Sequence, residues 1–449
     1  MNRILKTLSA IIISLTIAAS ANASVFSNII EKSPLDKTST IAVSIKNANN
    51  GKTIYEYNQE KLLHPASTLK LFTLKASYDT LGENYQFKTG VYKDNKKNLY
   101  LKLGADPTLT SAALTDLFKT VKSKNISAAN DIVIDPEIID NIQWGVGWMW
   151  DDDTSMYLPK ISPFSINNNL AKIVIKPGSK NSNPTIKNYS DYPFVLVNVL
   201  KNGDKNNIEI FRQPWINSDL VYLKGTIKSD YTFQLPINNT KDYFVICVEK
   251  SIKNAGINYK GSIKIAPTPP KTTLVAETTS APIENIVGDA LKNSNNYYTE
   301  LIFKAAGAKF KNSQGTTQNG IEMFKSYYST LKAANPDIVD ASGASRNDLI
   351  TANWMTDALN FIYKQENFKT YEPLIAKPVE GTLSDRLLNI SQNLRAKTGS
   401  ISGVSTLTGY VTSKSGTPYS FAILIQNFDI PSVDVKRFED TIVNAIYNY

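Results

Sequence analysis

Residues 64–70 read His-Pro-Ala-Ser-Thr-Leu-Lys, and the segment that follows, up to Tyr78, is largely apolar. Pro65 favours the first turn of a helix, so the pattern predicts a buried helix over Ser67–Tyr78 with Ser67 at its N-terminal end. Positions i and i+3 share one helix face, so the amine of Lys70 can reach the hydroxyl of Ser67. The backbone N–H of Ser67 is a free donor at the helix start and is suited to stabilising an oxyanion. This short element therefore predicts a nucleophile, a base and half of an oxyanion hole.

A second element, Lys397-Thr398-Gly399-Ser400, lies on a strand that is predicted to begin at Leu394. A lysine and a hydroxyl can together bind a substrate carboxylate. Gly399 would let the substrate pass close to the strand backbone. The backbone N–H of Ser400 would complete the oxyanion hole.

A third element, Ser294-Asn295-Asn296, separates two predicted helices, Pro282–Leu291 and Tyr297–Ala306. Ser294 could pass a proton to a leaving amine, and Asn296 could hold the Lys70 amine and the substrate amide. The triplet carries little weight alone, because the chain is rich in both residue types.

Two of these patterns have near copies. Ser329–Lys332 repeats Ser-Thr-Leu-Lys inside an expected helix over about Gly320–Ala334, where the N–H of Ser329 would already be bonded within the helix. Lys88–Gly90 repeats Lys-Thr-Gly, and we expect it to form a surface turn. The sequence therefore favours Ser67 over Ser329 as the nucleophile.

The two ends of the chain share one β pattern. Alternating runs at Ile41–Lys46 and Thr53–Tyr57 flank an Asn-Gly pair, which predicts a β-hairpin. Near the C-terminus, the predicted elements are strands at Leu394–Thr398, Val404–Val411 and Tyr419–Asn427 and a helix at Val433–Tyr447. We therefore expect an α+β catalytic domain, an antiparallel sheet with flanking helices, built from residues 24–84 and 277–449.

The region between these two parts of the chain has a different amino-acid composition. Residues 85–276 are rich in Asn, Lys, Thr and short β runs, which predicts one or two inserted β-rich domains. The pattern favours two, with one nested near residues 170–240. The Pro-rich stretch Ala266–Pro270 is expected to be a stiff crossing back to the first domain.

The N-terminus has the pattern of a secretory signal peptide. Arg3 and Lys6 precede an apolar run, Leu8–Ala19, and residues 21–23 read Ala-Asn-Ala, so cleavage is expected after residue 23. The apolar run is too short for a stable membrane span. The mature chain is therefore expected outside the cytoplasm.

The numbers of cysteines and histidines and the net charge limit the kinds of site and partner that are expected. The only cysteine, Cys247, lies in an apolar run and is expected in the core. The chain has a single histidine, His64, and because catalytic zinc sites commonly use several histidines, we expect no catalytic metal site. No cofactor is predicted. The formal charge of +9 suits an anionic wall polymer better than nucleic acid, although solubility alone explains it equally well.

The three elements together form the pattern of class A β-lactamases and penicillin-binding proteins. The chain resembles the low-molecular-mass penicillin-binding proteins with D-Ala-D-Ala carboxypeptidase and endopeptidase activity, in the branch with a large insertion between the first two motifs. The separation of 227 residues from Ser67 to Ser294 suits that branch. Further stretches that resemble the family are Gly147–Asp152, Ser165–Asn169, Asp340–Arg346, with departures at Ala341 and Ala344, and Gly381–Leu383.

The resemblance implies a β-lactamase/transpeptidase-like catalytic domain and a periplasmic enzyme that acts on peptidoglycan stem peptides and is acylated by β-lactam antibiotics. Ser67 would form the acyl-enzyme and Lys70 would be its base, in a neutral state that burial and the charge of Lys397 would favour. One of Asp151, Asp152 and Asp153 would meet the diaminopimelate end of the peptide. The alternatives are a β-lactamase or esterase on the same scaffold and a non-catalytic wall-binding protein.

Overall fold

The computed structural model describes residues 25–179, 182–212, 219–331 and 336–449 of the chain. The predicted signal peptide, residues 1–23, and Lys332 of the second Ser-Thr-Leu-Lys segment lie outside the described residues. Two compact units are distinguished: the first comprises Met1–Ala76, Gly288–Ser294 and Phe324–Tyr449, and the second comprises Ser77–Val287 and Asn295–Met323. Of the described helices, none is both long enough and apolar enough to cross a membrane.

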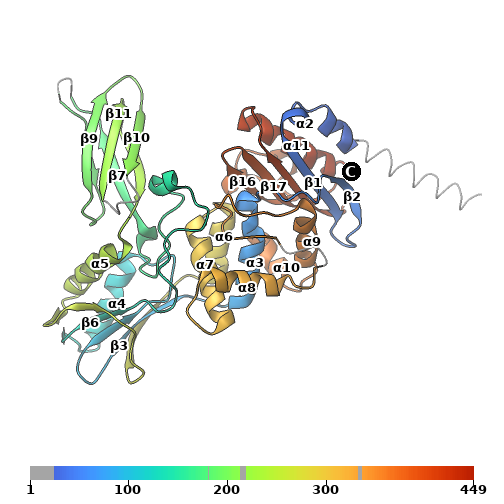
Figure 1. Ribbon diagram of the computed structural model, residues 1–449. Coiled ribbons are helices and arrows are strands. Elements are labelled where there is room, and N and C mark those ends of the chain that lie inside the picture. The colour runs from blue at the N-terminus through green and yellow to red at the C-terminus, as the bar shows by residue number, and fades with distance from the viewer. Residues whose placement is uncertain (1–24, 180–181, 213–218, 332–335) are drawn as a thin grey trace, which may run out of the picture. The chain divides into compact units, whose positions relative to one another are not determined.

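The first unit is built on one five-stranded antiparallel sheet in the order β16-β17-β18-β1-β2 (Figure 1). Its strands are β1 (Thr40–Asn47), β2 (Thr53–Tyr57), β16 (Leu394–Ile401), β17 (Val404–Thr412) and β18 (Pro418–Gln426). β1 pairs with β18 along its whole length, from Thr40 opposite Gln426 to Asn47 opposite Tyr419. The predicted hairpin and the shared sheet of the two chain ends are thus confirmed.

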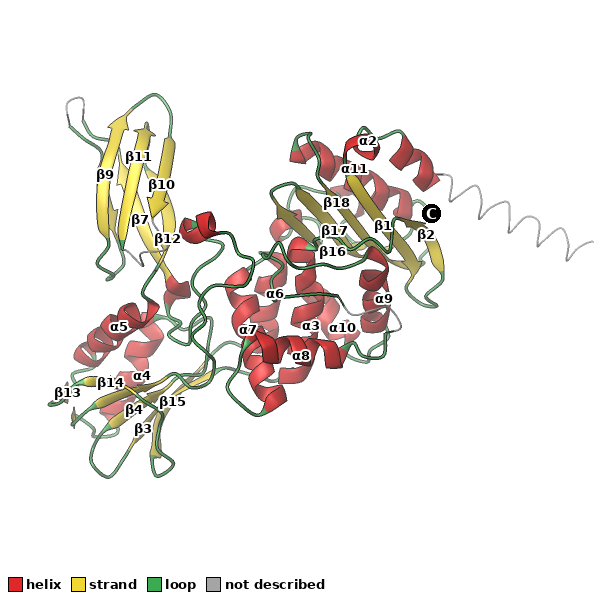
Figure 2. Ribbon diagram, in the orientation of Figure 1, coloured by secondary structure: helices red, strands yellow, loops and turns green. Residues whose placement is uncertain are grey.

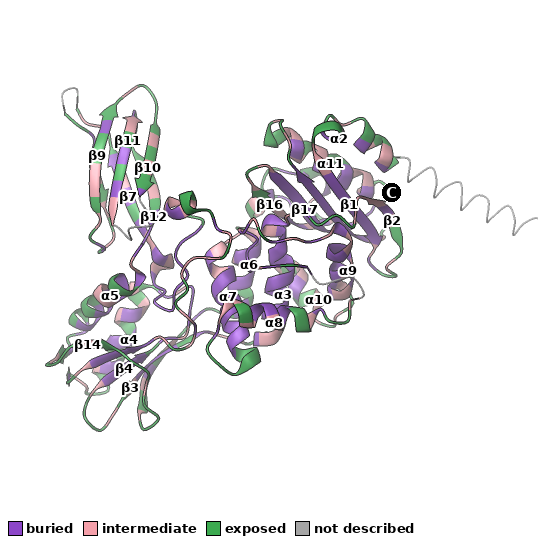
Figure 3. Cartoon of the chain, viewed as in Figure 1, coloured by how far each residue is buried: buried purple, intermediate pink, exposed green. Residues whose placement is uncertain are grey.

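Helices cover both faces of this sheet (Figure 2). On β17, Leu407 packs into the core with Val443 of α11, whereas Thr406 on the other face contacts Pro65, next to η1. This alternation is the two-residue period of a strand, and Figure 3 shows the central strands buried. The helical elements of this unit are α2 (Leu35–Thr38), η1 (Ala66–Leu69), α9 (Ala352–Tyr363), α10 (Phe368–Tyr371), η5 (Glu372–Leu374), η6 (Gly381–Leu383), η7 (Leu388–Ile390) and α11 (Ser432–Tyr447).

Four further helices are α3 (Lys70–Leu81), α6 (Ile283–Lys292), α7 (Asn296–Lys311) and α8 (Thr317–Tyr327). The boundary between the units passes through α3, α6 and α8. Within the first unit, the start of α3 is held by an aromatic cluster in which the ring of Phe72 lies 5.2 Å from Trp354 and 6.4 Å from Tyr328. The packed rings fix where the N-terminal turn of α3 meets the sheet.

The second unit contains a five-stranded sheet in the order β14-β6-β4-β3-β15. Helices α4 and α5 pack together and share one core with it, and Cys247 of α5 is buried there as predicted. The elements are β3 (Lys88–Lys93), β4 (Leu99–Lys102), α4 (Ser111–Ser123), β5 (Ala128–Ala129), β6 (Ile132–Asp135), α5 (Thr240–Asn254), β13 (Asn258–Tyr259), β14 (Ile263–Ile265) and β15 (Thr273–Thr279).

Residues 170–236 of the same unit form two three-stranded sheets, in the orders β12-β7-β8 and β10-β11-β9. Their strands are β7 (Leu170–Lys176), β8 (Thr185–Asn188), β9 (Val195–Asn202), β10 (Asn207–Arg212), β11 (Leu220–Ile227) and β12 (Tyr231–Pro236), preceded by the short turns η2 (Trp150–Thr154) and η3 (Asn167–Asn169). The expectation of an α+β fold with inserted β-rich parts is therefore confirmed.

Three local expectations were wrong. Lys88–Gly90 is not a surface turn but the start of β3, because its backbone pairs with β4 and β15 on either side. Ala266–Pro270 does not lead back to the first domain: it connects β14 and β15, the two edge strands of one sheet. The helix expected to reach Ala334 ends at Tyr327.

Candidate active site

Ser67 and Lys70 lie at the junction of two helical elements. Ser67 is in the 3-10 turn η1, and the regular helix α3 begins at Lys70, so the continuous α-helix expected from Ser67 is instead a tighter turn followed by a helix. Lys70 Nζ donates a hydrogen bond of 3.0 Å to Ser67 Oγ. Lys70 is fully buried and Ser67 is half-buried. The hydroxyl-bearing residue Ser67 is thus partly exposed to solvent, whereas its partner Lys70 is shielded from water.

The backbone directly before Ser67 is strained. Ala66 is buried and has a φ of 45°, a left-handed conformation that costs a residue with a Cβ about 1–2 kcal/mol. A Cβ on Gly343 would lie 1.9 Å from the carbonyl oxygen of Ala66, so only glycine fits there. Strained residues of this kind are concentrated at functional sites, where the surrounding structure holds them.

The loop that contains Gly343 also holds Lys70. The carbonyl oxygen of Ser342 accepts a hydrogen bond of 2.7 Å from Lys70 Nζ, and the carbonyl oxygen of Ala341 accepts one of 2.7 Å from Thr73 Oγ1. The resemblance singled out Asp340–Arg346, but the sequence contains no signal for a carbonyl that orients the amine of Lys70. The structure adds Ser342 to the site.

Two buried carboxyl groups hold this loop in shape. Asp340 accepts hydrogen bonds from the backbone N–H groups of Gly343 at 2.7 Å and Ser345 at 2.8 Å. Asp348 accepts one from Val339 N–H at 2.8 Å. Burial, and then the negative charge of Asp340, raise the pKa of Asp348 well above its usual range. The charged form of Asp348 is therefore disfavoured at this position.

His64 faces this loop. Its Nδ1 lies 3.1 Å from the carbonyl oxygen of Asp348, while the amine of Lys70 contacts the Ser67 hydroxyl. The lysine, and not the imidazole, has the position of a base for Ser67.

Lys397 of β16 lies next to Lys70. It is fully buried, and Lys397 Nζ donates a hydrogen bond of 2.9 Å to the carbonyl oxygen of Thr398. Burial, and then the charge of Lys70, lower the pKa of Lys397 well below its usual range. The structure therefore brings the predicted elements Ser67–Lys70 and Lys397–Ser400 together.

Packing within the protein requires a glycine at position 399. A Cβ at this position would lie 2.2 Å from Thr406 Oγ1, 2.9 Å from the carbonyl oxygen of Pro65 and 3.0 Å from the Cβ of Ala66. Two side-chain atoms and one backbone oxygen of the protein occupy this space. Gly399 lets β16 approach the turn that contains Ser67.

Ser400 lies on the same strand and is exposed. It pairs across the sheet with Ser405, whose Oγ donates a hydrogen bond of 2.7 Å to Glu439 on α11. Glu439 is fully buried and forms an ion pair of 2.8 Å with Arg386. The backbone of Ser400 is thus supported from the far side of the sheet.

Ser294 and Asn296 belong to different units. Ser294, in the first unit, follows α6 and has a left-handed φ of 58°, a second strained residue at a predicted motif. Asn296, in the second unit, begins α7 and donates a hydrogen bond of 3.0 Å from Nδ2 to the carbonyl oxygen of Tyr157.

The acidic stretch Asp151–Asp153 is only partly available to a ligand. Asp153 is buried and accepts a hydrogen bond of 2.6 Å from Arg212 Nε, and Lys160 is its second ion-pair partner. Asp153 is therefore a structural residue. Asp151 is exposed and Asp152 is half-buried.

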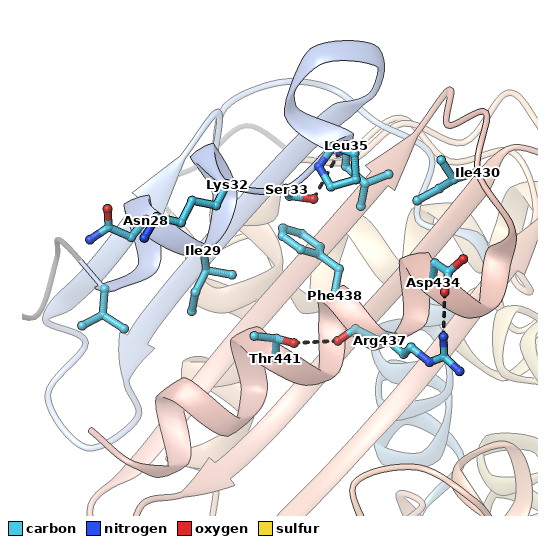
Figure 4. A pocket seen from close by; sticks show the side chains of 12 residues that line it. Asn28, Ile29, Lys32, Ser33, Leu35, Ile430, Asp434, Arg437, Phe438 and Thr441 are labelled. Atoms are coloured by element: carbon cyan, nitrogen blue, oxygen red, sulfur yellow. Dashed lines mark hydrogen bonds and ion pairs between the residues drawn. The ribbon is translucent and has the colours of Figure 1, made fainter.

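A groove of about 610 Å³ lies between the N-terminal residues and α11 (Figure 4). Its lining includes Ile29, Leu35, Ile430 and Phe438, and none of its residues belongs to the three motifs. The turn that contains Ser67 lies against the opposite face of the sheet, where Thr406 donates a hydrogen bond to the carbonyl oxygen of Pro65.

The chain is similar to known proteins over nearly its whole length. A model of the D-Ala-D-Ala carboxypeptidase 3 (S13) family matches residues 23–448. The D-alanyl-D-alanine carboxypeptidase DacB of Haemophilus influenzae is 26% identical over 92% of each chain. The D-alanyl-D-alanine carboxypeptidase of Actinomadura sp. strain R39 is 24% identical and covers 83% of this chain and 75% of its own.

Solved structures show the same fold. Penicillin binding protein 4 from Haemophilus influenzae superposes with a TM-score of 0.84 at 24% identity and covers 94% of this chain and 99% of its own. A predatory peptidoglycan endopeptidase from Bdellovibrio bacteriovorus has a TM-score of 0.52 at 15% identity, with coverage of 90% and 93%. The family match spans all three motifs, and the chain therefore belongs to the D-Ala-D-Ala carboxypeptidase 3 (S13) family.

Proposed function

We propose that the chain is a serine D-alanyl-D-alanine carboxypeptidase and endopeptidase that cleaves peptidoglycan stem peptides through an acyl-enzyme on Ser67. The observation that carries the proposal is the 3.0 Å hydrogen bond from Lys70 Nζ to Ser67 Oγ at the start of α3. Family membership supports a peptide substrate that ends in two D-alanines. A β-lactam complex of the Haemophilus penicillin binding protein 4 supports acylation of this chain by penicillin as well.

In the first step, Ser67 Oγ attacks the carbonyl carbon of the penultimate D-alanine, and its proton moves to Lys70 Nζ. Lys70 must be neutral to accept this proton. Because Lys70 and Lys397 are buried next to each other, a state in which both amines are protonated is disfavoured. The N–H groups of Ser67 and Ser400 would stabilise the oxyanion.

The other motif residues would bind the peptide and complete the proton path. Lys397 and Thr398 would hold the terminal carboxylate, and Asn296 would hold the substrate amide. Ser294 would pass the proton from Lys70 to the amine of the departing D-alanine. Water would then hydrolyse the ester on Ser67 and free the enzyme.

The proposal also includes the cellular location and the domain organisation of the chain. Residues 1–23 would direct export to the periplasm and be removed. Residues 24–84 and 277–449 would form the catalytic domain, with residues 85–276 inserted and a nested domain near 170–240. Within the insertion, Asp151 or Asp152 would meet the diaminopimelate end of the stem peptide, because Asp153 already has Arg212 and Lys160 as partners.

Labelling with a fluorescent penicillin followed by denaturing electrophoresis and peptide mapping tests the proposal. We expect one stable covalent label, on the peptide that contains Ser67. A label that is lost within seconds would favour the alternative of a β-lactamase. A saturating dose that leaves the protein unlabelled would contradict the proposal.

A further inference from the structure

The turn Gly381–Leu383 (η6) lies between two of the motifs in the first unit. Gly381 has a left-handed φ of 47°, and a Cβ there would lie 1.9 Å from the carbonyl oxygen of Lys292, two residues before Ser294. On the other side, Thr398 Oγ1 donates a hydrogen bond of 2.7 Å to Thr382 Oγ1. The turn therefore touches both the end of α6 and the strand β16.

Charged groups and backbone strain hold this turn in place. Glu380 accepts a hydrogen bond of 3.2 Å from Lys377 N–H and forms ion pairs with Lys292 at 3.3 Å and Arg395 at 3.8 Å. Val379 has a φ of 76°, a conformation that is a genuine outlier for a β-branched residue. Val379 is 62% exposed, so burial of its side chain does not explain the strain. Strain of this kind is expected where a neighbouring residue must be positioned.

We propose that Thr382 is a positioning residue that sets the direction in which the hydroxyl of Thr398 donates its hydrogen bond. This inference rests on the proposed function, in which Thr398 binds the terminal carboxylate of the substrate. In the structure the Thr398 hydroxyl donates its hydrogen bond to Thr382. A carboxylate can only accept, so the Thr398 proton must turn toward it when the substrate binds.

A hydroxyl at position 382 makes this reversal possible. It accepts from Thr398 in the free enzyme, and it can donate to Thr398 Oγ1 once the Thr398 proton is directed at the carboxylate. The Thr398 oxygen then keeps a partner in both states, which avoids the cost of an unpaired, half-buried hydroxyl. A side chain without a hydroxyl can do neither.

The test compares Thr382→Val, which keeps the shape and removes the hydroxyl, with Thr382→Ser, which keeps the hydroxyl. Each variant is assayed on a peptide that ends in D-Ala-D-Ala and on the same peptide with a C-terminal carboxamide. We expect Thr382→Val to lower kcat/KM for the carboxylate peptide about 10-fold, mainly through KM, the scale of one lost hydrogen bond to a charged group. For the carboxamide peptide we expect a change below about 2-fold, and Thr382→Ser should stay close to the unchanged enzyme on both.

Two controls separate positioning from folding. Ser384→Ala, an exposed change just after the same turn, should leave both peptides unaffected. In a Thr398→Val background, Thr382→Val should have no further effect, because the two hydroxyls act as one unit. If Thr382→Val does not fold, Thr382→Ala replaces it with the same expectation.

Equal losses on the two peptides, or no loss on either, would overturn the inference. The proposed function would fail separately, because in that case the unchanged protein would not be labelled by penicillin at all.

Discussion

The chain contains the tetrapeptide Ser-Thr-Leu-Lys twice, at Ser67–Lys70 and at Ser329–Lys332, and the two copies have different surroundings. Ser67 follows a strained residue, its amine partner Lys70 is fully buried, and a loop far along the chain supplies a carbonyl to that amine. Ser329 is exposed in a turn after α8, and its N–H is bonded to the carbonyl oxygen of Ser326 at 3.3 Å. We infer from this difference that a Ser-Thr-Leu-Lys segment becomes suited to nucleophilic chemistry through its position at a helix start and through the groups that pack around it.

Removal of the nucleophile should give the largest difference between the two copies. Ser67→Ala should abolish labelling by fluorescent penicillin, a loss of at least ~1000-fold, because no covalent bond can form without the hydroxyl. The matched variant Ser329→Ala should label at the rate of the unchanged protein. Equal labelling of the two variants would contradict the assignment of Ser67, and not Ser329, as the nucleophile.

Removal of the base should give the next largest effect. Lys70→Ala should slow acylation by at least ~100-fold, the low end for loss of general-base catalysis. His64→Ala should keep most of the acylation and D-alanine release, because the imidazole contacts the Asp348 carbonyl, and chelators should have no effect. A collapse of the rate in His64→Ala with an unchanged melting temperature would show that the lysine is not the base.

The role of the loop that contains Ser342 and Gly343 can be tested with two glycines that share a backbone conformation. Gly343 has a φ of 71° and Gly51 a φ of 74°, but only at Gly343 does a Cβ meet another atom, the carbonyl oxygen of Ala66. In both alanine variants the free energy of unfolding should fall by about 1–2 kcal/mol, because alanine is strained in the left-handed conformation. Gly343→Ala should in addition slow penicillin acylation by about 10-fold or more, because Ser342 or Ala66 must shift away from its working position. An unchanged acylation rate in folded Gly343→Ala would mean that the loop does not orient Lys70.

The smallest expected effect concerns the pH dependence of stability. Because the pKa of Asp348 is raised in the folded state, its contribution to stability is present below the usual aspartate pKa and is lost as the pH rises through the raised value. Asp348→Asn, which has no proton to lose, should therefore gain stability relative to the unchanged protein as the pH increases. Denaturant unfolding at a series of pH values measures this difference, with exposed Asp116→Asn as the control. Parallel stability curves for Asp348→Asn and the unchanged protein would show that the pKa of Asp348 is not raised by folding.

Local patterns predicted a large part of the fold and of the site. The two-residue alternation located β1, β2, β16, β17 and β18, and the spacing of Ser67 and Lys70 predicted the contact that the structure shows. The same local reasoning misplaced Lys88–Gly90 and the Pro-rich stretch 266–270. A strand is defined by its neighbours in space, and these are not visible in three or five residues.

Local sequence patterns were enough to predict that a serine and a lysine share the start of a helix, that a Lys-Thr-Gly strand exists, and which family pattern these motifs form. Helix and strand periodicity act over a few residues, so the chain encodes them locally. The folding of the whole chain, in contrast, brings the Ser342 carbonyl, 272 residues from Lys70, into hydrogen-bond contact with its amine. It alone also decided that Thr382 pairs with Thr398 and that Gly399 makes room for the turn of Ser67. These contacts depend on how distant elements pack, and neither a backbone carbonyl nor the absence of a Cβ leaves a sequence signal for its partner.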